Sequence, residues 1–264
     1  MVKKGLLIVF EGLDGSGKVT QLNLLQEYLK KEKDNTQANQ IIMFREYMQS
    51  VFKKNQQLKM FAEYLQDKHV PFVSYDFPRY YDDFWGGMVG RMLNGEFGKN
   101  PNPYLRSVFY LLDQANASKQ IRKDLREGKI VLCNRYITSS YIFQTGMFDT
   151  LEEKDQYISW LEEAGYKQLG IVKPDLVFAF YVKPEVAQEL IKKKNPREYL
   201  AKHSGGKDIN ETNLQIQLNA AKEMIQFCIT RKNWHLINCM DNDSIKPQNV
   251  IAQEIRELLK KYIK

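Results

Sequence analysis

A glycine-rich run that ends in lysine lies near the start of the 264-residue chain and limits the fold more than any other feature. It follows the apolar segment Gly5–Phe10 and precedes a helical pattern over Gln21–Lys30. In this context glycines let successive backbone N–H groups converge on an anion, and the helix N-terminus adds its positive end. The spacing, G-x-x-x-x-G-K, predicts a loop for nucleotide phosphates, and a turn without a ligand is the alternative. The run reads Gly12-Leu13-Asp14-Gly15-Ser16-Gly17-Lys18.

Short apolar segments alternate with helical patterns along the rest of the chain. This alternation indicates a parallel sheet with helices on both faces and ligands at the carboxyl ends of the strands. No low-complexity linker divides the sequence, so we expect one α/β domain over residues 1–264. The predicted buried strands are Gly5–Phe10, Val70–Tyr75, Ile130–Cys133, Leu176–Val182 and Trp234–Cys239, and the predicted helices are Gln21–Lys30, Tyr104–Glu127, Leu151–Ala164, Pro184–Lys194, Asn210–Thr230 and Pro247–Ile263.

The composition limits the classes of partner. Lysine and arginine exceed aspartate and glutamate by 39 to 32, and the net charge of +7 favours anionic partners. No nucleic-acid-binding motif accompanies the basic residues, and no apolar stretch is long enough to cross a membrane. The three cysteines have unrelated spacings, which argues against a disulfide framework or a zinc site and indicates a reducing cytoplasm. We therefore expect small anionic ligands, without a nucleic-acid or membrane partner.

The glycine-rich run, with Phe10 and Glu11 before it, resembles the opening of the thymidylate kinases. Further segments resemble motifs of that family and fall in the family's order over nearly the whole chain. They are Ser74-Tyr75-Asp76-Phe77-Pro78-Arg79-Tyr80, Leu93–Gly98, Asn102-Pro103-Tyr104, Asn134-Arg135-Tyr136 with Ser139, Ser140 and Gln144 after it, Lys173–Leu176, Gly206–Glu211 and Ile237–Cys239. The resemblance implies a three-layer P-loop kinase with a five-stranded parallel sheet. It also implies transfer of the γ-phosphoryl group of ATP to dTMP with Mg²⁺, and a homodimer.

The resemblance also implies roles for individual residues. Lys18, Arg135, Asp14 and Arg197 would be catalytic. Arg197 would come from a lid over about 192–207 and stabilise the transferred group, and Lys202 and Lys207 are the alternatives for that role. Phe77 and Tyr110 would face the pyrimidine. Arg135 suits the acceptor phosphate because its planar fork matches phosphate oxygens, and a structural ion pair is the alternative. The ATP-binding residues would be Gly12, Leu13, Asp14, Gly15, Ser16, Gly17, Lys18, Val19 and Thr20, and the dTMP-binding residues Asp14, Phe77, Arg79, Tyr80, Tyr110, Gln114, Arg135, Ser139 and Gln144.

Three positions depart from the family pattern. Val19 stands where a magnesium-binding Ser or Thr is expected, and Thr20 follows one place later, as in adenylate kinase and related kinases. The resemblance implies that Gln114 stands where the family often has an arginine that binds the acceptor phosphate, and that Asn134 replaces an aspartate near the metal. Magnesium would then be held mainly by phosphate oxygens and water, with Thr20, Asn134 or Asp14 assisting. The departures leave two alternatives open: a kinase for another pyrimidine nucleotide or a deoxynucleoside, and a nucleotide-binding protein without catalysis.

The segment over about 31–58 is longer than the family's connection between the first helix and the second strand. It is rich in Lys, Gln and Asn, with apolar residues at near-helical spacing. We expect an added amphipathic helix there, packed beside the first helix or on a partner.

Overall fold

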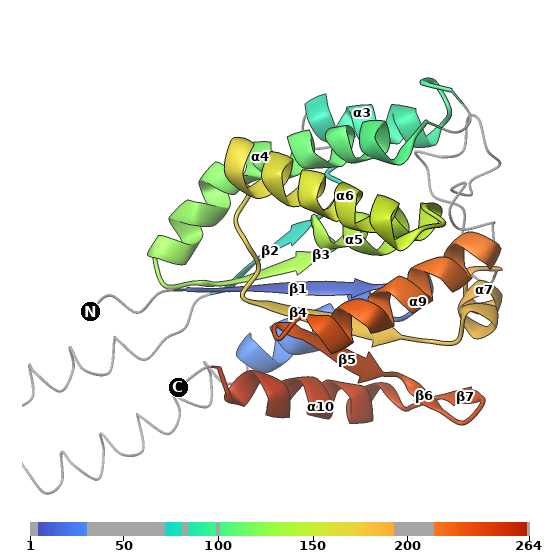
Figure 1. The fold of residues 1–264 in the computed structure, drawn as a ribbon. Helices are drawn as coiled ribbons and strands as arrows, with labels where there is room; N and C mark the ends of the chain where they lie inside the picture. The colour runs from blue at the N-terminus through green and yellow to red at the C-terminus, as the bar shows by residue number, and fades with distance from the viewer. Residues whose placement is uncertain (1–4, 31–71, 81–83, 99–100, 193–213, 263–264) are drawn as a thin grey trace, which may run out of the picture.

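The computed structural model describes residues 5–30, 72–80, 84–98, 101–192 and 214–262, and its centre is a parallel sheet between two layers of helices (Figure 1). The sheet has five strands in the order β2-β3-β1-β4-β5, and each neighbouring pair is parallel. The predicted α/β class and the five-stranded parallel sheet are therefore confirmed. The strands are β1 (Leu6–Gly12), β2 (Phe72–Asp76), β3 (Ile130–Asn134), β4 (Leu176–Tyr181) and β5 (Trp234–Asn238).

The strand residues alternate between two apolar cores, one on each face of the sheet. Leu7 and Val9 of β1 pack in one core, whereas Ile8 and Phe10 pack in the other. The first face is covered by α4 (Pro103–Arg126), α5 (Thr138–Phe143), α6 (Leu151–Glu162) and α9 (Leu214–Thr230). The second is covered by the helix over 18–30, α7 (Pro184–Lys192) and α10 (Gln248–Lys260). None of the described helices is both long and apolar enough to span a bilayer.

Several elements differ from the sequence predictions. β2 was predicted to be buried, but it is an edge strand whose Ser74 and Asp76 side chains are exposed. α3 (Phe84–Leu93), α5 and the small hairpin of β6 (Met240–Asp241) and β7 (Ser244–Ile245) were not predicted. α6 continues into the π-helical segment η2 (Glu163–Gln168), and η1 (Thr145–Met147) follows α5. The predicted insertion over 31–58 and the lid beyond residue 192 lie outside the described residues.

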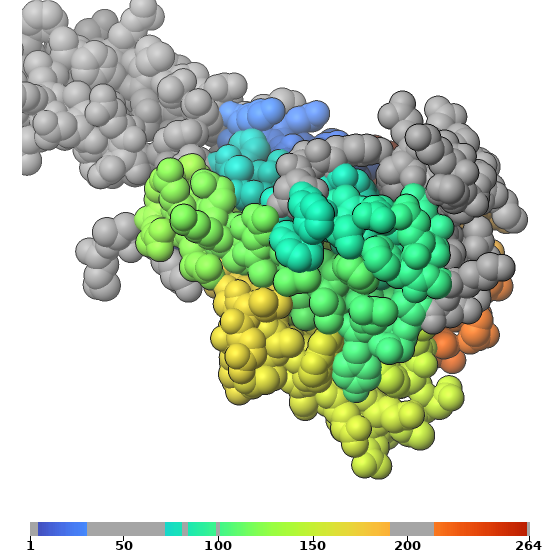
Figure 2. All heavy atoms as spheres, turned by 90° about the horizontal axis from the view of Figure 1, so that it is seen from above, coloured from blue at the N-terminus to red at the C-terminus, as the bar shows by residue number. Residues whose placement is uncertain are grey.

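Helix α4 turns a polar face inward. Asp113 and Gln114 are buried, whereas Leu105 and Val108, two of the apolar residues that indicated the helix, are exposed. Helices α3 and α4 lie side by side on this side of the molecule, next to α6 (Figure 2). Polar residues of α4 are thereby placed over the carboxyl ends of the strands, where a ligand is expected.

Candidate active site

The loop between β1 and the helix over 18–30 is shaped by its glycines and closed by its lysine. Gly15 has a φ of 82°, and a Cβ there would lie 2.6 Å from the carbonyl oxygen of Ala187 on α7. Only glycine meets both conditions without strain. The buried Lys18 side chain crosses the loop, and its Nζ donates to the carbonyl oxygen of Leu13 at 3.1 Å. The loop therefore has the compact form that an anion nest requires.

Arg135 follows β3 and points back to this loop. Its backbone has a φ of 61°, and its N–H donates to the carbonyl oxygen of Phe10 at 3.0 Å. Its guanidinium lies 2.7 Å from a carboxylate oxygen of Asp14. Burial opposes the charge of Arg135, but Asp14 and Glu11 outweigh it and raise the pKa of this arginine above its usual value. A fixed cation therefore stands beside the phosphate loop.

Glu11 is a fully buried carboxyl group to which the sequence analysis assigned no role. It accepts hydrogen bonds from the backbone N–H of Tyr136 at 3.1 Å, from Thr138 Oγ1 at 2.7 Å and from Ser139 Oγ at 2.8 Å. Burial raises the pKa of Glu11, while Arg135 and the hydroxyl donors oppose that shift. The carboxyl group thus joins the end of β1 to the turn that carries Arg135. A charged residue at the end of an apolar strand was the signal available in the sequence.

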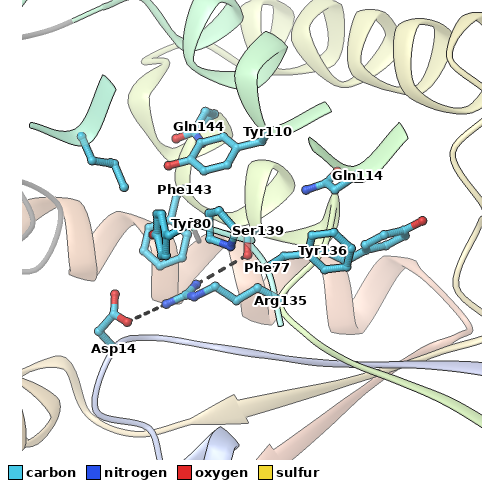
Figure 3. A pocket seen from close by; sticks show the side chains of 12 residues that line it. Asp14, Phe77, Tyr80, Tyr110, Gln114, Arg135, Tyr136, Ser139, Phe143 and Gln144 are labelled. Carbon is cyan, nitrogen blue, oxygen red and sulfur yellow. Dashed lines mark hydrogen bonds and ion pairs between the residues drawn. The ribbon is translucent and has the colours of Figure 1, made fainter. Parts of the chain in front are cut away.

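A pocket opens beside Asp14 and Arg135 (Figure 3). It contains about 550 Å³ of space not filled by protein, counting space open to solvent. Asp14 and Arg135 lie along one side, and Tyr110 and Gln144 lie across from them (Figure 3). The structure thus brings most of the predicted dTMP ligands together. The lining residues are Asp14, Phe77, Pro78, Tyr80, Leu93, Tyr110, Gln114, Arg135, Tyr136, Ser139, Phe143 and Gln144.

Arg79 is a predicted dTMP ligand that is not among these lining residues. Its backbone N–H donates to Asp113 Oδ2 at 3.0 Å, its Nε to Oδ1 at 2.9 Å and its Nη2 to the Asp113 carbonyl oxygen at 2.8 Å. These three bonds fasten the Phe77–Tyr80 segment to α4. In this structure Arg79 therefore holds the segment whose Phe77, Pro78 and Tyr80 line the pocket against α4.

Aromatic rings form part of the pocket wall. Phe77 is buried, and its ring centroid lies 5.4 Å from that of Tyr136. The guanidinium carbon of Arg135 lies 5.3 Å from the centre of the Phe143 ring. Rings held in this way offer a flat, apolar surface next to a cation, which suits a base joined to a phosphate. Phe143 and Tyr136 were not among the predicted ligands.

Two glutamines contribute amide groups to the lining. The exposed fractions of Gln114 and Gln144 are only 3% and 4%. The Oε1 atom of each is buried, without a hydrogen-bond partner among the described residues. Leaving a buried acceptor unpaired costs about 1–3 kcal/mol. Two pocket-lining residues with such an atom indicate a place for a polar ligand.

The family model described as Thymidylate kinase matches residues 53–242, which is more than half of the chain. The chain belongs to the thymidylate kinase family. The thymidylate kinase of Plasmodium falciparum (isolate 3D7) is 27% identical over 189 residues, which are 70% of this chain and 66% of that protein. The thymidylate kinase of Thermoanaerobacter sp. (strain X514) is 27% identical over 196 residues, which are 74% of this chain and 73% of that protein. The chain thus spans about two thirds to three quarters of these relatives.

The fold of the family is also found in this chain. A solved thymidylate kinase structure from Candida albicans superposes with a TM-score of 0.65 at 19% identity, and the match covers 98% of this chain and 92% of that one. These matches confirm the predicted family and the P-loop kinase fold. At the level of the family, they also confirm a nucleoside monophosphate kinase that acts on dTMP.

The described residues form no cage for a metal ion: they contain no group of three or more His, Cys, Asp and Glu side chains that could hold one. Asp14 is bound to Arg135, and the Asn134 amide donates to Asp76. The Oδ1 atom of Asn134 is buried without a hydrogen-bond partner in the described part, and Thr20 is half-buried in the first helical turn. These residues fit an Mg²⁺ held by phosphate oxygens and water, which they would contact through water.

Proposed function

We propose that this site transfers the γ-phosphoryl group of ATP to dTMP, giving dTDP and ADP. One observation carries the proposal: Asp14, a residue of the phosphate loop, and Arg135, a cation after β3, both line the pocket and touch each other. A donor phosphate on the loop and an acceptor phosphate in the pocket would therefore meet at this pair. Phosphoryl transfer depends mainly on such alignment and on charge neutralisation.

The roles of the residues follow from their positions. Lys18 and the loop N–H groups would hold the β- and γ-phosphates. Arg135 would bind the acceptor phosphate with its planar fork, and Asp14 would orient that cation. Bound Mg²⁺ would neutralise charge on the donor phosphates. Arg197, which lies outside the described residues, remains our candidate for the lid cation.

The base would lie in the aromatic part of the pocket. Phe77 offers a buried ring face, and stacking of a base on an aromatic ring is worth about 1–3 kcal/mol. Gln144 would place its unpaired amide on the polar edge of the pyrimidine, and Gln114 would hydrogen-bond the acceptor phosphate without a charge of its own. This arrangement supports a pyrimidine monophosphate as the acceptor.

A coupled assay of ADP release from ATP·Mg²⁺ tests the proposal, with dTMP and thymidine as separate acceptors. We expect turnover with dTMP and none with thymidine, because only dTMP offers a phosphate oxygen as the attacking group. Turnover with thymidine alone would overturn the assignment, as would the absence of turnover with dTMP.

A nucleotide-binding role without catalysis is the second candidate. It is favoured by the three departures at Val19, Gln114 and Asn134, of which Val19 has an aliphatic side chain that is half exposed. Val19 offers no oxygen to a metal ion. This candidate predicts that ATP or dTMP raises the melting temperature while no acceptor is phosphorylated. The same ADP-release assay, run beside a thermal-shift titration, distinguishes the two candidates.

We also propose that the chain acts as a homodimer in the cytoplasm. Leu105 and Val108 are exposed on α4, and burial of such residues against a second copy would be favourable. The cysteines Cys133, Cys228 and Cys239 are free, which suits a reducing compartment. Light scattering of the purified chain tests the dimer.

A further inference from the structure

Arg135 has an uncommon backbone conformation at the point where the pocket meets the phosphate loop. Its φ of 61° lies in the left-handed region, which residues other than glycine adopt mainly where the surrounding structure holds them. Two successive residues of β1 supply that support. The N–H of Arg135 donates to the carbonyl oxygen of Phe10 at 3.0 Å, and the N–H of Tyr136 donates to Glu11 Oε1 at 3.1 Å. The end of β1 therefore fixes the backbone from which the Arg135 side chain extends.

The Arg135 guanidinium is held at two of its nitrogens (Figure 3). Nη2 lies 2.7 Å from Asp14 Oδ1, whereas Nη1 lies 3.5 Å from Ser139 Oγ and 4.0 Å from Glu11 Oε2. The Ser139 hydroxyl itself donates to Glu11, at 2.8 Å from Oε1 and 3.0 Å from Oε2. Because a hydroxyl group has one hydrogen, the lone pairs of Ser139 are left to accept from Nη1. Glu11 thus sets the orientation in which Ser139 meets Arg135.

Glu11 lies behind the arginine and does not face a substrate. Its side chain is fully buried, and it is not among the residues that line the pocket. A buried carboxyl group is costly unless neighbouring donors satisfy it. The donors to Glu11 belong to Tyr136, Thr138 and Ser139, which all follow Arg135 closely in the sequence. The carboxyl group therefore acts on the turn that carries the cation.

We propose that Glu11 is a positioning residue of the acceptor side, which fixes the Arg135 guanidinium through Ser139 and the Tyr136 N–H. The inference rests on the proposed function, because it takes the phosphate of dTMP as the ligand of Arg135. It also gives Ser139 a role other than direct contact with dTMP. Ser139 accepts from Arg135, and its one hydroxyl hydrogen is used by Glu11.

Glu11→Gln tests this inference. Glutamine has nearly the same shape, but an amide nitrogen replaces one acceptor oxygen. In the place of Oε2 that nitrogen donates to Ser139 in competition with Arg135, and in the place of Oε1 it opposes three donors. We expect kcat/KM for dTMP to fall about tenfold, as for the loss of one hydrogen bond to a charged group, while KM for ATP changes by less than about twofold. Damage to the end of β1 would raise KM for ATP as well, because Gly12 begins the phosphate loop.

Thr138→Val is the matched control. Thr138 Oγ1 also donates to Glu11, at 2.7 Å, but Thr138 does not line the pocket. The variant loses a hydrogen bond to the same carboxyl group and keeps the contact between Ser139 and Arg135. Its kcat/KM for dTMP should therefore stay within about twofold of the wild-type value. Equal losses in Thr138→Val and Glu11→Gln would overturn the inference, because a general loss of stability would then explain both.

The Arg135→Ala background separates positioning from a structural role. If Glu11 acts through Arg135, Glu11→Gln should change kcat/KM for dTMP by less than about twofold once the arginine is absent. The same tenfold loss in both backgrounds would overturn the inference and leave the proposed function intact, as would a wild-type kcat/KM in Glu11→Gln. Absence of dTMP turnover by the unaltered protein would instead overturn the proposed function.

Ser139→Ala breaks the same path without altering the buried carboxyl group, so it keeps the test available even if Glu11→Gln does not fold. Its loss of kcat/KM for dTMP should likewise disappear in the Arg135→Ala background. A loss that persists there would mean that Ser139 contacts dTMP directly, and it would overturn the proposed path from Glu11 to Arg135.

Discussion

The phosphate loop and the acceptor pocket are built in different ways. The loop is one continuous run, Gly12–Lys18, whose shape follows from glycine conformations and a single helix start. The pocket is assembled from the loop, the segment after β2, α4 and the β3–α5 region. Its key contact joins Asp14 to Arg135 across 121 residues of sequence. The pairing of β1 with β3, which sets Phe10 opposite Asn134, brings these distant residues together. Local residues thus define the donor side, whereas sheet order defines the acceptor side.

The largest effect should come from the donor side. Lys18→Ala removes the cation that would neutralise the β- and γ-phosphates, and we expect kcat to fall by about 10³-fold or more. The variant also loses the bond from Lys18 Nζ to the Leu13 carbonyl oxygen, which is worth about 1 kcal/mol of stability. The ADP-release assay and a thermal melt measure the two effects separately.

Lys119→Ala is a matched control for this change. Lys119 lies exposed on α4, outside the pocket lining, so its loss should leave kcat unchanged. If Lys18→Ala kept wild-type turnover, the donor phosphates would have to bind elsewhere. The assignment of the phosphate loop to ATP and of the pocket to the acceptor would then be wrong.

Arg135 is the corresponding test of the acceptor side. Arg135→Ala should lower kcat/KM for dTMP by about 10²–10³-fold, because the acceptor phosphate loses its cation. It also removes the cation nearest to the buried Glu11 and Asp14, leaving Lys18 as their countercharge, which should cost about 3 kcal/mol of stability. Steady-state kinetics and urea unfolding measure these effects. Arg135→Lys keeps the charge without the planar fork and should recover part of the loss; no recovery would mean that charge at this position is not what binds dTMP.

The same contrast explains how much the sequence could predict. The apolar runs and the glycine loop are local signals, and they predicted all five strands of the sheet and the turn between β1 and the helix over 18–30. α3 was missed because Gly86, Gly87 and Gly90 lower its helix propensity. Gly86 has a packing role instead, since a Cβ there would collide with the carbonyl oxygen of Arg79. Such a reason becomes visible only when two separate segments lie together.

The side-chain contacts on the acceptor side were harder to predict for the same reason. The role of Arg79 in binding dTMP stays a prediction, and its ion pair with Asp113 of α4 could not be predicted because it depends on how the two segments pack. The three hydrogen bonds that Glu11 accepts come from residues more than 120 positions away. The family resemblance therefore identified which residues surround the pocket, but it did not identify which side chains these residues contact.

Glu11 gives a pH-dependent test of the junction between the two regions. Burial raises the pKa of Glu11 in the folded protein above its unfolded value of about 4.3. The folded state therefore retains a proton that the unfolded state releases, and this group makes stability fall as pH rises between the two pKa values. Glu11→Gln cannot titrate at this position, so its free energy of unfolding should not show this decrease with rising pH. Urea unfolding of both proteins at half-unit steps from pH 4.5 to 8 measures the difference.

The carboxyl groups whose pKa values are lowered, such as Asp124 and Glu153, act with the opposite sign at lower pH and are shared by both proteins. They cancel in the comparison of wild type with Glu11→Gln. Parallel stability curves for the two proteins over this range would contradict the assignment of a raised pKa to Glu11.

The smallest effect should come from a helix that serves neither region directly. Thr150 caps α6: its Oγ1 accepts from the Glu153 N–H at 3.2 Å, and the Glu153 carboxylate accepts from the Thr150 N–H at 3.2 Å. Thr150→Ala should lower the free energy of unfolding by about 1 kcal/mol and leave kcat/KM for dTMP unchanged. Glu153→Gln preserves both sides of the capping box and should cost less. A clear loss of activity in Thr150→Ala would show that the pocket depends on distant helix stability, because neither residue lines it.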